Sequence, residues 1–196
     1  MKSFAVALLT AALPMALAAQ QPAGAAPVTD PIATAFRGRI VGMHRNIAQA
    51  FDSIPEAKFD YKPTPSQLTV GFIAQHIASD SYLFCSNFGA MKPTLPAKDT
   101  ETPDSVKAKW PKDTLVAKLK ASFTFCQSAL GQLRDSTISE PVTLTFGGNT
   151  RTLSRINMVL GHALDLSDHY SQIANYMRLN NLVPPSALPR PARAGN

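Results

Sequence analysis

Cysteines and long apolar stretches are both scarce in this sequence. Among its 196 residues there are only two cysteines, too few to hold together a small disulfide-rich scaffold. The longest apolar run, residues 4–13, is shorter than the roughly 20 residues that a membrane-spanning helix needs. We therefore expect neither a disulfide-stapled mini-protein nor stable insertion into a membrane.

Several common functional motifs are also missing. The chain has no glycine-rich phosphate loop, no serine nucleophile elbow and no Cys-x-x-Cys pair, which disfavours nucleotide, serine-hydrolase and thioredoxin-like chemistry. The net charge of +6 could suggest nucleic acid. However, many of the basic residues lie in a middle linker and the C-terminal tail, and none form a stripe interleaved with aromatic residues. No nucleic-acid partner is expected.

The N-terminal residues have the features of a signal peptide. Lys2 gives a short positive start, and residues 4–13 form the apolar run. Small residues follow at the spacing that a signal peptidase recognises. We expect cleavage near Ala18 or Ala19. Residues 1–19 would then be a signal peptide, and the mature protein would be exported, either periplasmic or secreted.

The rest of the chain divides into one folded region with low-complexity flanks. Residues 20–31 and 184–196 are rich in proline and alanine, and we expect a flexible lead-in and a disordered tail. Since hydrophobic residues make up 45% of the chain, residues 32–183 are expected to form one globular domain. Within this domain, apolar residues recur at spacings of three and four, which predicts four amphipathic helices. These helices fall within residues 32–54, 70–88, 112–133 and 153–179.

The connections between these helices are long. Residues 91–111 contain several prolines and are expected to form a polar linker over the surface. Residues 141–152 contain an alternating apolar segment followed by Gly-Gly-Asn, which predicts a small β-hairpin before the last helix. The pattern favours an all-α fold, a four-helix bundle of up-down helices with long crossover connections.

Polar residues that can bind metals lie on the core-facing side of two helices. On the last helix, His162, Asp165 and His169 fall within an arc of about 60°, at roughly 100° per residue. His76 lies among apolar residues of the second helix and is expected to face inward. Burying such groups costs free energy unless they are paired or coordinated.

Spacing selects three of these residues as a metal site. His162 and His169 are seven positions apart, a rise of about 10 Å, so both would struggle to reach one ion. Asp165 and His169 are four apart and can chelate together. We expect His76, Asp165 and His169 to be the metal ligands, with His162 as a fourth ligand or outer-shell group. The alternative is a set of hydrogen-bonded core residues without a metal. His44 is interpreted as an ordinary residue of the first helix.

The two cysteines lie on helices that can be neighbours. Cys85 is nine residues from His76, on roughly the opposite side of the second helix, so we do not expect it at the metal site. Cys126 lies on the apolar face of the third helix. In an exported protein this pair suggests a disulfide, and the alternative is two buried reduced thiols.

Three stretches resemble the DinB-like family in their order and spacing. Residues 54–65 are similar to the loop after the family's first helix. Residues 71–78 read Gly-Phe-Ile-Ala-Gln-His-Ile-Ala and contain His76. Residues 168–185 begin with Asp-His-Tyr-Ser-Gln and are similar to the family's C-terminal pattern. The resemblance covers about residues 32–187.

This resemblance implies a four-helix bundle in which three histidines hold a divalent metal, commonly nickel or zinc. His76 matches the ligand from the second helix, and His169 matches the last ligand. Asp165 stands where the family has its other histidine, and Ser171 and Asn181 replace usual glycines. A carboxylate at this position favours a harder ion such as Mn, Fe or Zn; it is equally consistent with a site that has lost its metal.

The resemblance also implies a class of function. Relatives include thiol-dependent transferases and isomerases, and predicted metal-dependent hydrolases. Because an exported protein would meet little low-molecular-weight thiol, activation of a metal-bound water is the more general mechanism. The expected function is a divalent-metal-dependent enzyme of the hydrolase or thiol-transferase type, acting on an unidentified substrate. The alternative is a non-catalytic binding protein with a degenerate metal site. A small-molecule ligand and a homodimer are both compatible with the chain.

Overall fold

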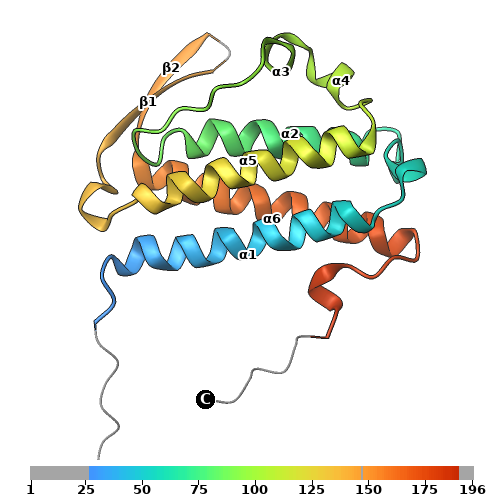
Figure 1. The fold of residues 1–196 in the computed structure, drawn as a ribbon, viewed down its shortest axis with the longest axis horizontal. Helices are drawn as coiled ribbons and strands as arrows, with labels where there is room; N and C mark the ends of the chain where they lie inside the picture. Colours follow the sequence, from blue (N-terminus) through green and yellow to red (C-terminus); the bar gives the residue numbers. More distant parts are fainter. Residues whose placement is uncertain (1–26, 147, 190–196) are drawn as a thin grey trace, which may run out of the picture.

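Four long helices dominate the fold (Figure 1). The computed structural model describes residues 27–146 and 148–189. The predicted signal peptide, residues 1–19, lies outside the described residues. The long helices lie close to the four ranges in which apolar periodicity predicted them. They are α1 (Pro31–Ser53), α2 (Val70–Cys85), α5 (Lys112–Gln132) and α6 (Arg155–Leu179).

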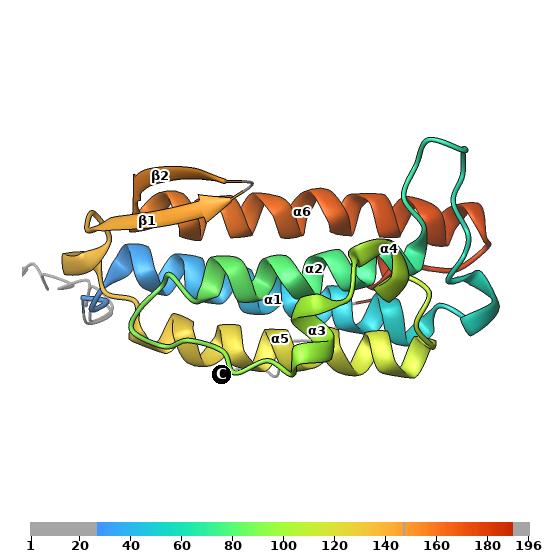
Figure 2. The ribbon, with the colours of Figure 1, turned by 90° about the horizontal axis from the view of Figure 1, so that it is seen from above.

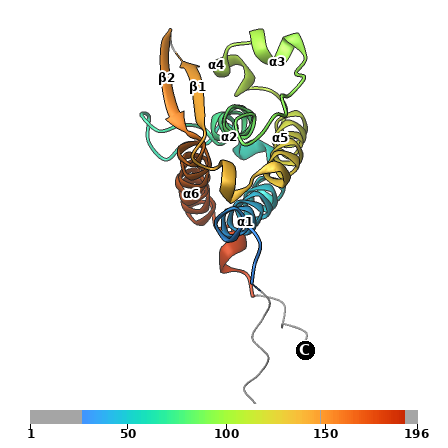
Figure 3. The same cartoon turned by 90° about the vertical axis from the view of Figure 1, so that its left-hand side faces the viewer.

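The four long helices pack around one apolar core. α2 contacts α5 and α6, and α1 contacts the same two helices, as the end-on view of Figure 3 shows. α1 and α6 run in one direction, and α2 and α5 in the other (Figures 1 and 2). Large apolar side chains fill the space between them, and the burial of each contributes about 1.5–3 kcal/mol. Fully buried examples are Ile40, Phe51, Ile73, Phe88, Leu119 and Leu166.

Because α2 and α5 run in the same direction, the chain must return along the molecule between them. This return passes over the outside of α2 and α5 (Figure 3). The sequence predicted a linker over the surface here, and the structure adds two short helices within it. These are α3 (Ala97–Glu101) and α4 (Asp104–Lys107). Pro96 and Pro103 precede them, and each first turn contains an aspartate, which the helix dipole favours there.

A two-stranded antiparallel hairpin precedes α6, as the alternation in the sequence predicted. β1 (Pro141–Phe146) pairs with β2 (Asn149–Ser154), so that Pro141 lies opposite Ser154. In the turn, Gly148 has a φ of 78°, a backbone angle that glycine adopts without steric cost.

Three short 3₁₀ helices complete the described secondary structure: η1 (Glu56–Lys58), η2 (Asp135–Thr137) and η3 (Pro185–Ala187). η3 lies in the segment that the sequence predicted to be a disordered tail. There the backbone N–H of Ser186 donates to the hydroxyl of Tyr170 at 2.8 Å, which ties the start of this segment to α6. The end of the tail lies outside the described residues. No helix in the described ranges is both long and apolar enough to cross a bilayer.

Candidate metal centres

Two clusters of metal-ligating side chains lie within the described part of the chain. In each, the candidate ligand atoms all lie within 4.8 Å of one another, which is close enough for one metal ion to reach all three. We call them the α2–α6 cluster and the central cluster. The α2–α6 cluster is His76, Asp165 and His169, and the central cluster is His44, Cys126 and His162.

The α2–α6 cluster brings together the three residues that the sequence selected as metal ligands. Asp165 and His169 are four residues apart on α6, and His169 Nε2 lies 3.3 Å from Asp165 Oδ1. The rings of His76 and His169 are perpendicular, with centroids 4.8 Å apart. The side chain of His169 is 8% exposed and that of His76 is 32% exposed. Solvent therefore reaches the cluster from the His76 side.

A chain of hydrogen bonds on α6 sets the tautomer of His169. Its Nδ1 lies 3.3 Å from Gln172 Oε1, and the side-chain amide of Gln172 donates to Asp168 Oδ2 at 3.1 Å. The amide nitrogen of Gln172 faces Asp168 and its oxygen faces the ring, so this network favours the tautomer with the proton on Nδ1. Nε2 is then the atom that faces Asp165. Metal-bound histidines are held in the same way, by a partner on the other ring N–H.

The space beside His169 Nε2 requires a positive charge. In the neutral ring, Nε2 carries a lone pair and faces a carboxylate oxygen of Asp165 at 3.3 Å. The other carboxylate oxygen, Oδ2, is buried and has no hydrogen-bond partner among the described residues. A proton on Nε2 pairs this nitrogen with Oδ1 of Asp165 but does nothing for Oδ2. A cation in the cluster can satisfy both Nε2 and Oδ2. The donor set therefore fits a divalent metal.

Asp80 is a fourth polar group at this cluster, and sequence reasoning missed it. It lies four residues after His76 on α2, with Oδ2 3.4 Å from His76 Nε2. Burial raises the pKa of the Asp80 carboxyl. The neighbouring His76 acts against this increase, and the negative charge of Asp165 adds to it. The four-residue spacing from His76 was the signal that could have revealed it, because residues four apart share a helix face.

The structure brings His44 and His162 together, a pairing that the sequence did not predict. His44 was interpreted as an ordinary residue, and His162 as a fourth or outer-shell group of the α2–α6 cluster. The structure places their Nε2 atoms 3.3 Å apart, with Cys126 Sγ 3.4 Å from His162 Nε2. All three residues are at most 2% exposed. His162 shares a face of α6 with His169. Because the helix rises about 10 Å between the two residues, His162 lies beside different residues of the neighbouring helices.

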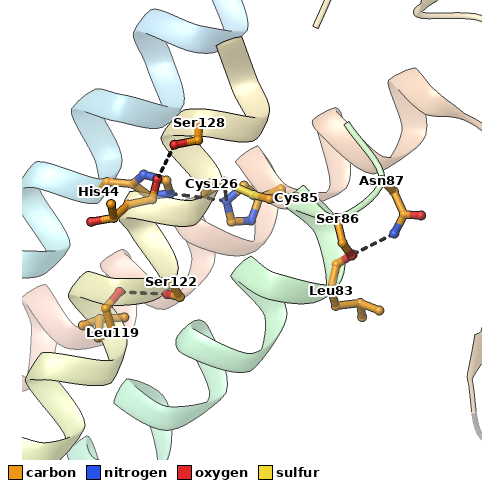
Figure 4. Close-up of a disulfide and its surroundings, with 11 residues drawn as sticks. His44, Leu83, Cys85, Ser86, Asn87, Leu119, Ser122, Cys126 and Ser128 are labelled. Atoms are coloured by element: carbon orange, nitrogen blue, oxygen red, sulfur yellow. Dashed lines mark hydrogen bonds between the residues drawn. A yellow bond between two sulfur atoms is a disulfide. The ribbon is translucent and has the colours of Figure 1, made fainter. Parts of the chain in front are cut away.

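A disulfide joins Cys85 on α2 to Cys126 on α5, the pairing that the sequence suggested. Their Cα atoms are 5.1 Å apart, within the usual range for a disulfide. Figure 4 shows His44, Cys126 and Cys85 converging from three helices. With His162 on α6, each of the four long helices contributes one side chain to this part of the core.

The two imidazoles of the central cluster are neutral. Burial, with the neighbouring His162, lowers the pKa of His44 to about 3. Burial also lowers the pKa of His162 to about 4, although Asp165 opposes the shift. The Nδ1 atoms of both rings are buried and have no hydrogen-bond partner in the described ranges. Each such atom costs about 1–3 kcal/mol, so the chain keeps two unfavourable polar groups in its core.

A cavity of about 280 Å³ lies beside α2, but it contains no residue of either cluster. Gln75 and Ser79 line it from α2, and Trp110 and Lys118 line its far side. Lys118 is already paired with the carboxylate of Asp99 at 2.6 Å. The lining of this cavity therefore gives no information about a substrate that would bind at the α2–α6 cluster.

Comparison with known proteins gives a family and a fold. The sequence profile of the DinB superfamily matches residues 39–173. No match was found among proteins of curated function.

Three solved structures have a similar fold. A DinB-like protein from Bacillus cereus ATCC 10987 has a TM-score of 0.59 at 18% identity, over 78% of this chain and 95% of that chain. A histidine-to-alanine mutant of the mycothiol-dependent maleylpyruvate isomerase has a TM-score of 0.58 at 12% identity, over 75% and 63% of the two chains. A conserved protein from Enterococcus faecalis has a TM-score of 0.56 at 16% identity, over 78% and 98%. At these identities the likeness shows a common fold.

Proposed function

This chain belongs to the DinB superfamily, and on that premise we propose that it is a divalent-metal-dependent enzyme. The proposed ligands are His76 of α2 together with Asp165 and His169 of α6. The four long helices would be the four-helix bundle of the family, with the return between α2 and α5 as its long crossover. The proposal includes export of the mature protein, because of the signal-peptide features of residues 1–19.

One observation carries the proposal. Gln172 keeps a proton on His169 Nδ1, so Nε2 points at Asp165 Oδ1 3.3 Å away. Oδ2 of Asp165 is buried and has no hydrogen-bond partner within the ranges that the structure describes. Together with His169 Nε2, it gives two acceptor groups beside a place where a cation fits. His76 approaches the same place from α2.

The protein residues would position the ion and leave it accessible. A divalent cation supplies Lewis acidity, which lowers the pKa of a bound water or thiol and polarises a carbonyl group. Three protein ligands leave a coordination position open, as in catalytic rather than structural sites. Asp80 Oδ2 lies 3.4 Å from His76 Nε2 and would orient the His76 ring, as Gln172 would for His169. The exposed side of His76 is the approach for a substrate.

Two reaction types fit such a site. One solved structure of similar fold is described as a mycothiol-dependent isomerase, which supports a thiol co-substrate. Export would favour hydrolysis instead, since water is then the abundant nucleophile. We propose a hydrolase or thiol-transferase activity on a small molecule.

Metal analysis of the purified protein tests this proposal. The protein is kept without reductant, so that the Cys85–Cys126 disulfide stays intact, and is dialysed against Zn²⁺, Ni²⁺ or Mn²⁺. We expect roughly one ion per chain in the wild type and none in His169→Ala. The variant Asp113→Asn, which changes an exposed carboxylate on α5, should bind like the wild type.

Two results would contradict the proposal. A wild-type protein that binds none of these ions would favour the alternative, a non-catalytic binding protein with a degenerate site. Full metal content in His169→Ala would show that the ligand assignment is wrong.

A further inference from the structure

The proposed enzyme makes no use of the central cluster, yet this cluster has the composition of a metal site. Cys85, whose sulfur is bonded to that of Cys126, would be the fourth donor. Two thiols and two imidazoles are a common donor set for tetrahedral zinc. The four side chains are His44 of α1, Cys85 of α2, Cys126 of α5 and His162 of α6.

Two distances in the cluster are close to those of tetrahedral coordination. With Zn–N bonds of about 2.0–2.1 Å and Zn–S bonds of about 2.3 Å, two nitrogen ligands lie about 3.3 Å apart, and nitrogen and sulfur about 3.6 Å apart. In the structure, His44 Nε2 and His162 Nε2 are 3.3 Å apart. Cys126 Sγ and His162 Nε2 are 3.4 Å apart. The ring nitrogens therefore need almost no movement to bind an ion.

The two sulfur atoms must move apart before both can bind an ion. In a tetrahedral site two sulfur ligands lie about 3.8 Å apart, farther than the roughly 2.05 Å of a disulfide bond. Rotation of the Cys85 and Cys126 side chains can supply this separation while α2 and α5 stay packed. A disulfide and a metal exclude each other here, because the sulfurs must be thiolates to bind an ion.

We propose that the central cluster is a redox-controlled Cys₂His₂ site, which is a disulfide when oxidised and binds a zinc-type divalent cation when reduced. In reduction by a phosphine, two electrons pass from phosphorus to the disulfide, which becomes two thiols. Water supplies the oxygen of the phosphine oxide and the two protons. Binding of Zn²⁺ then releases those two protons from the thiols. In the reverse direction, hydrogen peroxide takes two electrons from the two thiolates; the disulfide re-forms, the ion leaves, and two protons are consumed as the peroxide becomes two waters.

The buried imidazoles support this proposal over a purely structural disulfide. A disulfide that only cross-links α2 and α5 needs no polar neighbours, and apolar side chains would fill the same space at lower cost. The structure instead places the imidazole of His162 against Cys126 Sγ and that of His44 against His162, and both residues are at most 2% exposed. Ligand binding by Nε2 gives these groups a function in the core.

Cobalt is a suitable probe, because thiolate ligands give Co²⁺ an intense charge-transfer band in the near ultraviolet. The full chain carrying His169→Ala is used, so that the α2–α6 cluster does not contribute. After reduction with a phosphine, we expect roughly one Co²⁺ per chain with this band. The oxidised protein should show no such band, and neither should reduced Cys126→Ser. Peroxide should abolish the band and release the ion.

A second measurement covers the case in which reduction weakens the fold. Saturating Zn²⁺ should raise the melting temperature of the reduced protein by about 5–10 °C, and it should leave reduced Cys85→Ser/Cys126→Ser unchanged. A folded, reduced protein without the thiolate band overturns the proposal. So does a reduced protein that unfolds and does not refold when zinc is added. Both measurements use His169→Ala, so their failure is independent of the proposed enzyme.

Discussion

Gln172 decides which nitrogen of His169 faces the α2–α6 cluster. Its oxygen lies against Nδ1, and its amide is held by Asp168. If Nε2 binds a metal, Gln172→Ala should weaken that binding by about 10–100-fold, because the ring loses the partner that fixes its tautomer and orientation. Competition with a chelator of known affinity measures the change.

The control for this prediction is a glutamine far from the cluster. Gln127 is exposed on α5, and Gln127→Ala should bind metal like the wild type. Both variants should keep the far-ultraviolet circular dichroism of the native protein. Equal metal affinity in Gln172→Ala and the wild type would show that Gln172 does not set the tautomer.

Sequence spacing predicted the members of the α2–α6 cluster better than those of the central cluster. Asp165 and His169 belong together because they are four residues apart on one helix, and that relation is local. The partners of His162 are not local. Periodicity gives the angle of a side chain around its helix axis, but the residue that faces it depends on how four helices align along their lengths. His44 lies beside His162 because of this alignment, which the sequence of one helix does not encode.

At the scale of elements, the start of α1 depends on a residue about a hundred positions away. Asp30 precedes the helix but makes no side-chain cap. Instead, the carboxylate of Asp135 accepts from the backbone N–H of Ile32 at 3.0 Å and from that of Ala33 at 2.7 Å. Asp135→Ala should reduce the free energy of unfolding by about 1–2 kcal/mol, measured by urea denaturation.

The matched control is an aspartate in the first turn of another helix. Asp113 of α5 is exposed and contributes mainly through the helix dipole, so Asp113→Ala should cost no more than about 0.5 kcal/mol. A loss for Asp135→Ala no larger than this would mean that the distant cap does not stabilise α1.

Long helices and strands were easier to predict from the sequence than short ones. The long helices span several apolar repeats, so their periodicity is clear, and the hairpin has both strand alternation and a Gly-Gly turn. α3 and α4 have five and four residues, which is too short for a 3.6-residue period to be recognised. Their positions follow Pro96 and Pro103, which in the sequence alone indicate only a linker.

At the scale of the whole molecule, the central cluster should make stability depend on pH. His44 and His162 have pKa values of about 3 and about 4 in the folded protein, against about 6.5 in the unfolded chain. Between pH 6.5 and about 4 the unfolded state therefore binds protons that the folded state does not. The contribution of the two histidines to the free energy of unfolding is fully present above this window. It falls as the pH decreases, by up to about 1.4 kcal/mol per pH unit for each histidine.

Comparing the wild type with one histidine variant separates this effect from the effects of other titrating groups. His44→Gln removes one of the two histidines and keeps an amide near the position of Nε2, so its loss of stability between pH 6 and 4.5 should be about half as steep. Asp80, whose raised pKa acts in the opposite direction, affects both proteins alike. Burial lowers the pKa of His169, but Asp165 and Gln172 outweigh it, so that this pKa is raised overall. The contribution of His169 to stability is lost only as the pH rises above 6.5. Urea denaturation of oxidised protein in a chelator measures both slopes. Equal slopes would mean that His44 already binds a proton in the folded core.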